Sequence, residues 1–409
     1  MRLLLLTHSF PPEIRSTSNL MMELAEDLSA KGHDVTVVTP IPRYNVEQVD
    51  PKYHRKLFVI ENANNIRVIR VRSFWIHMVG PVKRWLGQLG LAALFAACGL
   101  KAGKQDLVFA YSPPLTLGLS CYLLSRVYRI PFVFNVQDLF PQNIIDLGIL
   151  RNCFLIRFFQ SLERFVYRAA SIITVHSNGN KQFVEALGIN SDKVRVFYNW
   201  VDMSSIQYSE EKRPFFSDPE LDTKFTVLFA GVLGTAQDLD VIVDAAKILA
   251  TDPDILFLIV GRGVERGRIE ARCKNEGVTN VVFRDFVPKE KYSHLVQSSD
   301  VGLVTLREEM KTPVVPSKIA HIMACGRPVV ASLDTDGDAA VLIRESHGGF
   351  CLPPGNSIEL AKSIQLLKAD DCLRNELQKN GRAYALRHFD RRRVTSEYEN
   401  LFHTLVSHR

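Results

Sequence analysis

Continuous apolar runs alternate with stretches of helical periodicity along most of the chain. The runs lie at residues 3–6, 35–39, 66–71, 107–111, 132–136, 172–175 and 194–198, and then at 225–230, 255–260, 281–283, 301–304, 329–331 and 350–352. Runs without polar alternation are typical of parallel strands that helices cover on both faces. The helical stretches between them, such as 18–31 before Gly32, are the expected connections. The pattern predicts the α/β class, with two doubly wound Rossmann-like domains in tandem.

The break between the two rounds of alternation lies at 201–224, which is rich in Ser, Glu, Pro and Asp and has no period. Such a stretch indicates an interdomain connection. We therefore expect a first domain at 1–205, a second domain at 206–387 and a helical tail at 388–409. Tandem doubly wound domains predict a ligand cleft between them, at the carboxyl ends of both sheets.

Composition narrows the class of protein. A chain of 409 residues with 46% apolar and 23% charged residues is ordinary for a globular enzyme. The net charge of +6 fits anionic small molecules or an anionic membrane face and is too weak to indicate nucleic acid. The 7 cysteines form no CxxC pair and no zinc spacing, which favours a reducing compartment. Leucines at 3–6 are too few for a signal peptide and predict a buried first strand.

The segment from Pro316 to Val330 predicts a phosphate site. Its opening proline and serine suit the start of a helix, where proline loses no hydrogen bond and serine can cap. Gly326 suits the position just past the helix end, and Pro328 prevents continuation. Unpaired N–H groups at the helix start favour an anion, and Lys318 adds a cation there. An ordinary helix-to-strand connection has the same outline and stays the alternative.

Two glycine turns follow strands of the second domain. Gly231 and Gly234 come after the run at 225–230, and Gly261 comes after the run at 255–260. Glycine lets backbone approach a phosphate or sugar closely. Arginines at 262, 266 and 268 form a dense positive cluster beside the second turn, and arginine can bind a diphosphate through two donors. The alternatives are a common strand-end turn and a solvated basic loop.

Two loops of the first domain also follow strands. The loop at 7–18 contains Ser16 and Thr17, whose hydroxyl groups can donate to an anion, but Ser16 or Ser18 could equally cap a helix. In the second loop a Gln-Asp pair precedes a proline, so the carboxylate of Asp138 would point into the mouth of the cleft. Helix capping is the alternative for Asp138.

One segment is a candidate for membrane contact. No residue carries a charge from Trp85 to Leu100, but this stretch is shorter than the about 20 residues that spanning a bilayer requires. Lys83 and Arg84 precede it, and lysines at 101 and 104 follow it. This suits a helix that dips into an anionic leaflet, with the basic residues and Trp85 at the headgroups. It equally suits a helix buried inside the first domain.

Together these motifs resemble the family 4 glycosyltransferases of the GT-B fold over nearly the whole chain. The matching pieces are Phe10–Glu13, Gly32–Thr39, Asp138–Pro141, Gly231–Asp240 and Pro316–Pro328. All of these pieces except Gly231–Asp240 are similar to the branch that contains the WbuB-type L-fucosamine transferases and the WcaI-type colanic acid transferases. Members of this branch build bacterial surface polysaccharides on a membrane lipid carrier.

The resemblance implies a retaining transfer of a sugar, expected to be an N-acetylated or deoxy hexose, from a nucleotide-diphosphate donor such as a UDP-sugar. The acceptor would be an undecaprenyl-diphosphate-linked saccharide, so the protein would lie on the inner face of the bacterial cytoplasmic membrane. Lys318 and Arg266 would stabilise the leaving diphosphate, and Asp138 would contact the acceptor. Donor contacts would come from Gly231, Gly234, Gly261, Arg262, Phe286, Val287, Val314, Val315, Pro316, Ser317 and His321, and from Ser16 and Thr17 of the first domain.

The resemblance further implies that the C-terminal tail packs back onto the first domain. Related enzymes use the turn at 286–288 as a wall of the nucleobase pocket, although Phe286 could equally be a core residue. No D-x-D motif stands at a strand end, so we expect no cofactor and no essential metal. The Asp334-Thr335-Asp336 spelling lies in a Gly/Asp-rich loop and is interpreted as a solvated turn.

One departure from the family pattern bears on activity. Many members carry a Glu-x7-Glu pair whose second carboxylate holds the ribose, and those positions are Pro313 and His321 here. A histidine can still hydrogen-bond a ribose hydroxyl, and the N–H groups of 314 and 315 could face the sugar. Three hypotheses remain: a transferase with a lipid-linked acceptor, a transferase with a soluble acceptor, and a non-catalytic subunit that binds sugar nucleotides.

Overall fold

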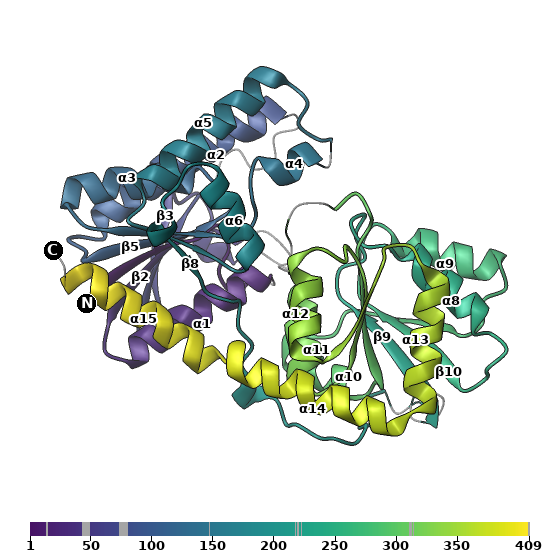
Figure 1. The fold of residues 1–409 in the computed structure, drawn as a ribbon. Helices are drawn as coiled ribbons and strands as arrows, with labels where there is room; N and C mark the ends of the chain where they lie inside the picture. Colours follow the sequence, from purple (N-terminus) through teal and green to yellow (C-terminus); the bar gives the residue numbers. More distant parts are fainter. Residues whose placement is uncertain are drawn as a thin grey trace. The chain divides into compact units, whose positions relative to one another are not determined.

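The chain forms two compact units, one of residues 1–199 with 392–409 and one of residues 200–391. The computed structural model describes residues 1–13, 15–42, 50–72, 81–146, 148–216, 218, 221, 223–310, 313 and 315–407, with 81–86 described by their backbone alone. The sequence pattern had placed the two divisions after residues 205 and 387, a few residues away in each case. Element labels below are those of Figure 1.

A sheet of eight strands within the described residues forms the centre of the first unit, in the order β3-β4-β2-β1-β5-β6-β7-β8. Its pairs are parallel except for β3 with β4. The strands are β1 (Arg2–Leu6), β2 (Asp34–Pro40), β3 (Phe58–Ala63), β4 (Ile66–Val71), β5 (Leu107–Ser112), β6 (Phe132–Val136), β7 (Ile172–Val175) and β8 (Val194–Val196). Each apolar run predicted in the first domain is therefore a strand.

Strand β3 is the one that the apolar pattern missed. It lies at the edge of the sheet, where Phe58 and Ile60 are exposed, so it lacks the continuous apolar character of a buried strand. The hairpin to β4 turns at Asn64 and Asn65, which both have positive φ angles, 50° and 63°. Two residues with positive φ are the mark of a type I′ turn, so the Asn-Asn pair was the signal in the sequence.

Helices cover both faces of this sheet (Figure 1). The alternation along the strands explains the two layers, because Leu4 and Leu6 of β1 pack toward the helices on one face and Leu3 and Leu5 toward the other. The helices are α1 (Ser16–Ala30), α2 (Pro81–Lys101), α3 (Leu117–Tyr128), α4 (Gln142–Asp146), α5 (Cys153–Ala169), α6 (Asn178–Ala186) and α15 (Arg391–Ser407), with short 3₁₀ turns at Pro51–Tyr53 and Ser191–Lys193.

The uncharged segment at 85–100 lies within α2, and its described part is largely buried. Leu91, Phe95 and Cys98 belong to the core of the first unit, and the exposed positions are mainly the small residues Gly90, Ala93 and Ala97. The buried interpretation therefore holds for residues 87–99. The side chains of Lys83, Arg84 and Trp85 lie outside the described residues. Among the described residues, no helix combines the length and the apolar character that crossing a membrane takes.

The C-terminal helix α15 packs on the first unit beside α1 (Figure 1). Tyr398 and Phe402 sit against Phe109 of β5, with ring centroids 5.6 and 5.8 Å away. Polar contacts add to this packing, since Glu399 accepts from Lys31 Nζ at 2.6 Å. The tail thus completes the core of the unit in which the chain begins.

The second unit has a six-stranded parallel sheet within its described residues, in the order β11-β10-β9-β12-β13-β14. Every apolar run predicted in the second domain is one of its strands. The strands are β9 (Phe225–Ala230), β10 (Ile255–Val260), β11 (Val281–Arg284), β12 (Val301–Thr305), β13 (Val329–Ser332) and β14 (Gly349–Leu352). The helices are α8 (Asp240–Ile248), α9 (Arg266–Asn275), α10 (Lys289–Gln297), α11 (Ser317–Ala324), α12 (Asp338–Ser346), α13 (Ser357–Ala369) and α14 (Asp371–His388).

The predicted connection at 201–224 has a short 3₁₀ turn at Met203–Ser205 and is fastened to the second unit by Arg327. The guanidinium of this residue is buried and donates to the carbonyl oxygens of Glu211 at 3.0 Å and Gln297 at 2.9 Å. It also donates to those of Ser209, Glu210 and Gly326. One planar side chain with five N–H donors therefore satisfies the backbone carbonyl groups of residues 209–211, which belong to no helix or strand.

Replacing Arg327 by methionine should destabilise the second unit by about 3 kcal/mol or more, because several buried carbonyl oxygens lose their donor. Chemical denaturation followed by circular dichroism measures this loss. Arg344→Met is the matched control, since Arg344 makes an exposed bond to the carbonyl of Thr335, and it should change stability by less than about 1 kcal/mol. Equal stability of the two variants would contradict the role assigned to Arg327.

Candidate functional site

The order of the strands marks where a ligand site is expected in each unit. In an open α/β sheet, ligands bind outside the carboxyl ends of the strands, where the strand order reverses. In the second unit this point lies between β9 and β12, because the chain proceeds from β9 to β10 on one side and returns to β12 on the other. The loops there are 231–239 after β9 and 306–316 after β12. In the first unit the reversal lies between β1 and β5.

Lys318 reaches across the glycine turn after β9. Its Nζ lies 3.7 Å from the ring centroid of Phe229 and donates to Gln237 Oε1 at 3.2 Å. Its aliphatic stem fills the space where a side chain at residue 231 would be, with Cε only 2.7 Å from an ideal Cβ on Gly231. Burial lowers the pKa of Lys318 to about 7. Among the described residues the ammonium group has Gln237 as its hydrogen-bond acceptor, which leaves donors for a phosphate at the switch point.

The helix that carries Lys318 begins as the sequence predicts but is not capped by serine. Pro316 occupies the N-cap position and Ser317 is the first helical residue, without a side-chain capping bond. The helix ends before Gly326, whose φ of 64° is the left-handed conformation that follows a helix end. The ring of Tyr208 also occupies the space beside this glycine, so two constraints exclude a side chain there.

The second glycine turn is held against the first by close backbone contact. Gly261 has a φ of 149°, and an ideal Cβ there would lie 1.8 Å from the carbonyl oxygen of Gly231. A Cβ on Gly263 would lie 2.1 Å from the carbonyl oxygen of Leu233. Backbone bonds join the loops, with Leu233 N donating to Arg262 O at 2.9 Å. In this structure the glycines of the second turn serve the contact between the two loops. Gly234 has no such crowding.

The predicted arginine cluster divides into paired and exposed members. Arg266 donates to Glu270 and Asp285 and to the carbonyl oxygens of Gly261 and Arg284, so a role in diphosphate binding would require it to leave these partners. Arg268 is held by Asp240 and Glu265. Arg262 has 73% of its side chain exposed, and its ion pair among the described residues is a long contact of 3.8 Å to Asp285. Of the three, Arg262 has the side chain best able to reach a ligand.

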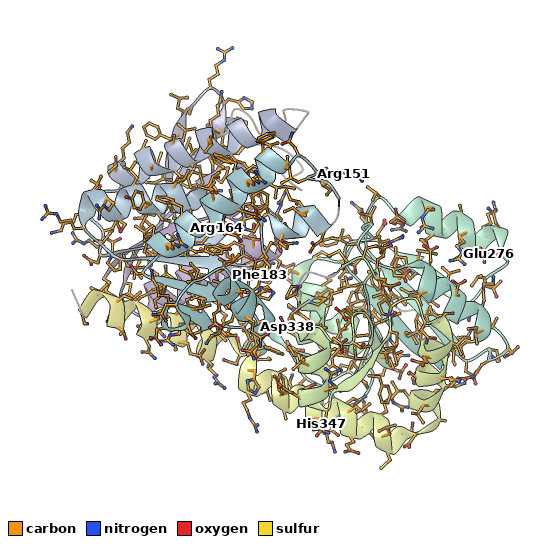
Figure 2. The ribbon with its side chains drawn as sticks, turned by 45° about the horizontal axis from the view of Figure 1, so that its top comes forward. Arg151, Arg164, Phe183, Glu276, Asp338 and His347 are labelled. Atoms are coloured by element: carbon orange, nitrogen blue, oxygen red, sulfur yellow. The ribbon has the colours of Figure 1, made fainter. Side chains whose placement is uncertain are left out.

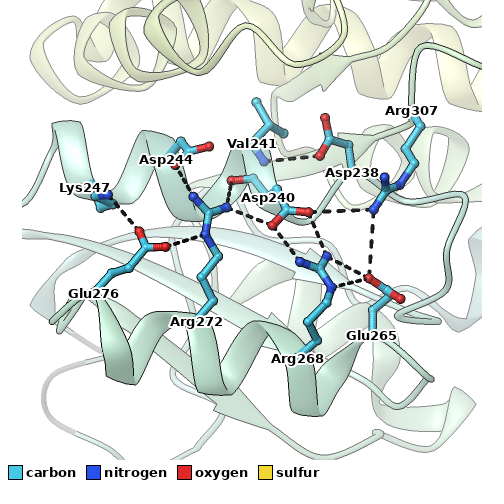
Figure 3. Close-up of polar contacts among 10 residues, drawn as sticks. All are labelled: Asp238, Asp240, Val241, Asp244, Lys247, Glu265, Arg268, Arg272, Glu276 and Arg307. Carbon is cyan, nitrogen blue, oxygen red and sulfur yellow. Dashed lines mark hydrogen bonds and ion pairs between the residues drawn. The ribbon is translucent and has the colours of Figure 1, made fainter.

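A network of ion pairs joins helix α8, which follows the loop after β9, to helix α9 (Figure 3). Asp240 accepts from both Arg268 and Arg272, and Glu276 accepts from Arg272 and Lys247. Arg307 joins the network from the loop after β12, and its backbone N–H donates to Ala236 O at 3.1 Å. The loops on both sides of the switch point are therefore tied together.

The remaining predicted donor contacts lie at the same edge of the second sheet. His321 is one turn along α11 from Ser317, and its Nδ1 lies 3.1 Å from the carbonyl oxygen of Ser317. Phe286 follows β11 with 45% of its surface exposed, so it is no core residue, and Val287 beside it is buried. Val315 is partly buried, and Val314 lies outside the described residues.

In the first unit, Asp138 follows β6 as predicted. It retains solvent contact, but the surrounding protein raises the pKa of its carboxyl group. Helix α4 begins only at Gln142, several residues later. The neighbouring Gln137 accepts from Asn199 at 2.7 Å and donates to Asn135 at 2.8 Å. Asn135 in turn donates to Tyr398 of the C-terminal helix. A chain of hydrogen bonds therefore holds the loop that carries Asp138 to helix α15.

Ser16 and Thr17 form the first turn of α1, whose N-cap is Arg15 without a side-chain capping bond. The alternative, that Ser16 or Ser18 is the N-cap of this helix, is therefore ruled out. Ser18 is buried and bonds Ser9, 2.6 Å away. Thr17 hydrogen-bonds Tyr111. Ser16 and Thr17 thus lie at the start of a helix next to the switch point between β1 and β5.

Two residues near these sites were not predicted. His8 lies at the end of β1, where burial and the nearby Arg15 lower its pKa to about 4, so the ring is neutral at pH 7. It hydrogen-bonds the backbone of Pro113 at the end of β5, and its Nδ1 has no partner among the described residues. Gln237, the acceptor for Lys318, is the other. In the sequence the signal was a polar residue just past a strand end for His8, and a polar residue in the loop after the glycine turn for Gln237.

Two other features of the described residues do not belong to this site. His33, Glu399 and His403 have possible ligand atoms within 4.8 Å of one another, but Lys31 and the N-terminal ammonium already contact this group, which opposes a cation. A depression of about 790 Å³ lined by residues such as Arg129, Pro131 and Thr404 lies at the amino ends of β6 and β7. Ligands of open α/β sheets bind at the opposite ends.

Two family models match the chain, one over most of each unit. Residues 18–200 match the glycosyl transferase 4-like domain, and residues 211–384 match the glycosyl transferases group 1. The chain is a glycosyltransferase of the GT-B fold. The predicted fold class and the predicted enzyme class are confirmed.

The relatives of this glycosyltransferase are distant. It is 23% identical to the Escherichia coli K12 protein named for colanic acid biosynthesis, WcaI, over 98% of this chain and 99% of that protein. It is also 23% identical to the N,N′-diacetylbacillosaminyl-diphospho-undecaprenol alpha-1,3-N-acetylgalactosaminyltransferase of Campylobacter jejuni, over 69% of this chain and 73% of that enzyme. Anabaena HepE, solved in complex with UDP, superposes with a TM-score of 0.72 at 19% identity and covers 99% of this chain. The WcaI-like part of the predicted branch is thus supported, and the L-fucosamine part stays a prediction.

Gly261→Ala should destabilise the second unit of the glycosyltransferase by about 3 kcal/mol or more, because both the positive φ and the contact with Gly231 forbid a Cβ. Gly267→Ala is the control. It lies in helix α9 with open space around it, so alanine should be neutral or stabilise by up to about 1 kcal/mol. Urea denaturation compares the two. A fully stable Gly261→Ala variant would show that the contact between the loops is not needed.

Proposed function

We propose that this glycosyltransferase moves a sugar, an N-acetylated or deoxy hexose, from a UDP-sugar to an undecaprenyl-diphosphate-linked saccharide with retention of anomeric configuration. Its product would serve bacterial O-antigen, capsule or exopolysaccharide synthesis. The distant similarity to WcaI and to an enzyme whose name includes an undecaprenol-linked acceptor supports this. The fold it shares with HepE, which was solved with UDP, supports a nucleotide-diphosphate donor.

One observation carries the donor assignment. Lys318 holds a partly buried ammonium at the switch point of the second unit, against Phe229 and Gln237, at the start of a helix without a side-chain cap. A diphosphate bound there would meet the ammonium, the N–H groups at the start of α11 and the glycine turn at Gly231. The exposed Arg262 would supply a second cation, and the exposed ring of Phe286 would face the nucleobase.

The positive charges of the donor site act when the bond between the sugar and the nucleotide diphosphate breaks. Departure of the nucleotide diphosphate leaves an oxocarbenium-like sugar, and negative charge builds on the leaving phosphate. Lys318 would stabilise that charge, with Arg266 contributing only if it leaves its carboxylate partners. A phosphate oxygen of the donor can accept the acceptor's proton, so no dedicated base is required. We expect no essential metal, because no D-x-D motif stands at a strand end. Asp138 would orient the acceptor hydroxyl from the first unit.

A non-catalytic subunit that binds sugar nucleotides is the second candidate. His321 stands where many family members have the ribose-binding glutamate, and its Nδ1 lies against the Ser317 carbonyl oxygen. A subunit of this kind would bind UDP through Lys318 and transfer nothing. Turnover separates the two candidates, and a soluble acceptor, the third possibility, would show as transfer that needs no lipid.

The transfer assay uses a panel of UDP-, GDP- and dTDP-sugars with a detergent-solubilised polyprenyl-diphosphate saccharide, in excess EDTA. We expect transfer from a UDP-sugar with retention, seen by NMR of the product. Lys318→Ala should lower turnover at least about tenfold, roughly 1.4 kcal/mol. Lys379→Ala, at a lysine elsewhere in the second unit, is the control and should behave as wild type. Donor binding without any turnover would favour the subunit, and activity rescued only by Mg²⁺ would contradict the metal-free mechanism.

The lowered pKa of Lys318, about 7, predicts a pH dependence of UDP binding. A bound diphosphate favours the charged ammonium and so raises this pKa, and binding above pH 7 must then take up a proton. UDP affinity should therefore fall by up to about tenfold per pH unit above 7, as long as the lysine stays charged in the complex. Calorimetry in buffers of different ionisation enthalpy measures the uptake. Lys318→Arg should flatten the dependence, because arginine stays charged. Equal proton uptake in this variant would assign the titration to another group.

A further inference from the structure

Helix α5 presents a stripe of aromatic side chains to solvent. Phe154, Phe158 and Phe165 are exposed over 77%, 45% and 42% of their surface. Their spacing puts them on one face of the helix, while Phe159 and Val166 face the core and are buried. A monomeric protein seldom leaves three phenylalanines of one helix in water, so this face has the character of a binding surface.

The stripe continues onto the neighbouring helix α3. The ring of Tyr122 meets that of Phe165 edge-on, with centroids 5.0 Å apart. Leu123 and Val127 of the same helix are exposed, one turn apart. Figure 1 shows α3 and α5 on the same side of the first unit's sheet, so the apolar surface extends over two helices.

Arginines surround this surface. Arg157, Arg164 and Arg168 lie along α5, and Arg151 precedes it. Figure 2 labels two of the set, Arg151 before the helix and Arg164 along it. On α3, the guanidinium carbon of Arg126 lies 6.0 Å from the centroid of the Tyr122 ring.

Carboxylates are nearly absent from the two helices. Neither α3 nor α5 contains an aspartate, and their single glutamate, Glu163, is buried on the inner side of α5. Exposed aromatic rings flanked by basic residues alone are complementary to an anionic lipid surface, where the rings enter the interface and the guanidinium groups meet the phosphates. A protein partner would need a face that is both acidic and apolar. The same two helices of a second copy of this chain do not provide one, because their single carboxylate, Glu163, is buried.

We propose that this face, formed by Phe154, Phe158, Phe165, Tyr122 and the arginines around them, docks on an anionic phospholipid leaflet. The proposal deepens the proposed function, since a lipid-linked acceptor would be reached from that leaflet. It places the main membrane contact on α5, whereas the sequence had indicated the uncharged segment from Trp85 to Leu100 with Lys83 and Arg84 before it. Part of α2 can be core, as observed, without loss of membrane binding.

Sedimentation with vesicles of phosphatidylcholine, with and without phosphatidylglycerol, tests the proposal on the full chain. We expect wild type to bind the anionic vesicles more tightly and to lose binding as salt rises, because screening weakens surface charge attraction. The double variant Phe154→Ser/Phe158→Ser should bind at least about tenfold more weakly. Ile358→Ser/Leu366→Ser removes two exposed apolar side chains of α13 in the second unit and should bind as wild type. Replacing Arg157, Arg164 and Arg168 by Gln should remove the preference for anionic lipid.

Three results would overturn the proposal. The first is wild type that stays in the supernatant. The second is release by Lys83→Glu/Arg84→Glu with no effect of the phenylalanine substitutions. The third is sedimentation equilibrium showing a wild-type dimer that these substitutions dissociate while vesicle binding persists, because the face then binds a second copy.

UDP titration of each variant shows that it is folded. Loss of vesicle binding with transfer to a detergent-solubilised acceptor intact would support the docking face, and failure of transfer with vesicle binding intact would refute the proposed function alone.

Discussion

The candidate donor site depends on a single packing arrangement, the lysine side chain of residue 318 laid over the glycine turn after β9. Its stem takes the space of a missing Cβ on Gly231, and its ammonium rests on the ring of Phe229. An ammonium in such a place is costly without a counter-charge, which is why burial lowers its pKa to about 7. The protein therefore holds a cation whose charge is fully stabilised only when an anion arrives.

The surroundings of Lys318 keep this arrangement in place. The carbonyl oxygen of Gly231 lies so close to Gly261 that a Cβ there has no room. The loops after β9 and β12 are joined by a hydrogen bond from the backbone of Arg307. Most arginines near the turn are neutralised by carboxylates, as Figure 3 shows for Arg268 and Arg272. The excess positive charge at this edge of the sheet is thus concentrated on Lys318 and Arg262. Selective binding of a diphosphate requires a rigid site in which few cations remain available to the ligand and the binding cations are fixed in place.

Continuous apolar runs were enough to predict every strand of the described residues except β3, because a buried parallel strand is a short run without polar positions. The helix at 317–324 was also predictable, since Pro316, Gly326 and Pro328 each act through local backbone geometry. The partners of individual side chains were not. Arg266 and Lys318 are both cations in the first turn of a helix, yet one is paired with Glu270 and Asp285 and the other faces Phe229 and Gln237. That difference comes from long-range packing, which no local pattern contains.

The surface chemistry shows the same limit. The uncharged segment at 85–100 drew attention because it is apolar throughout, but from residue 87 onward the core of the first unit accounts for most of it. The exposed phenylalanines of α5 alternate with arginines and polar residues, so they resemble an ordinary amphipathic helix until burial shows which face is inside.

Hydrogen–deuterium exchange with and without UDP tests the central claim most directly, that the switch point of the second unit binds the diphosphate around Lys318. The account predicts that UDP slows exchange in peptides covering 229–239 and 316–322 of the wild type, and that Lys318→Ala abolishes this protection at the same UDP concentration. Protection confined to the first unit, or unchanged protection in the Lys318→Ala variant, would contradict it.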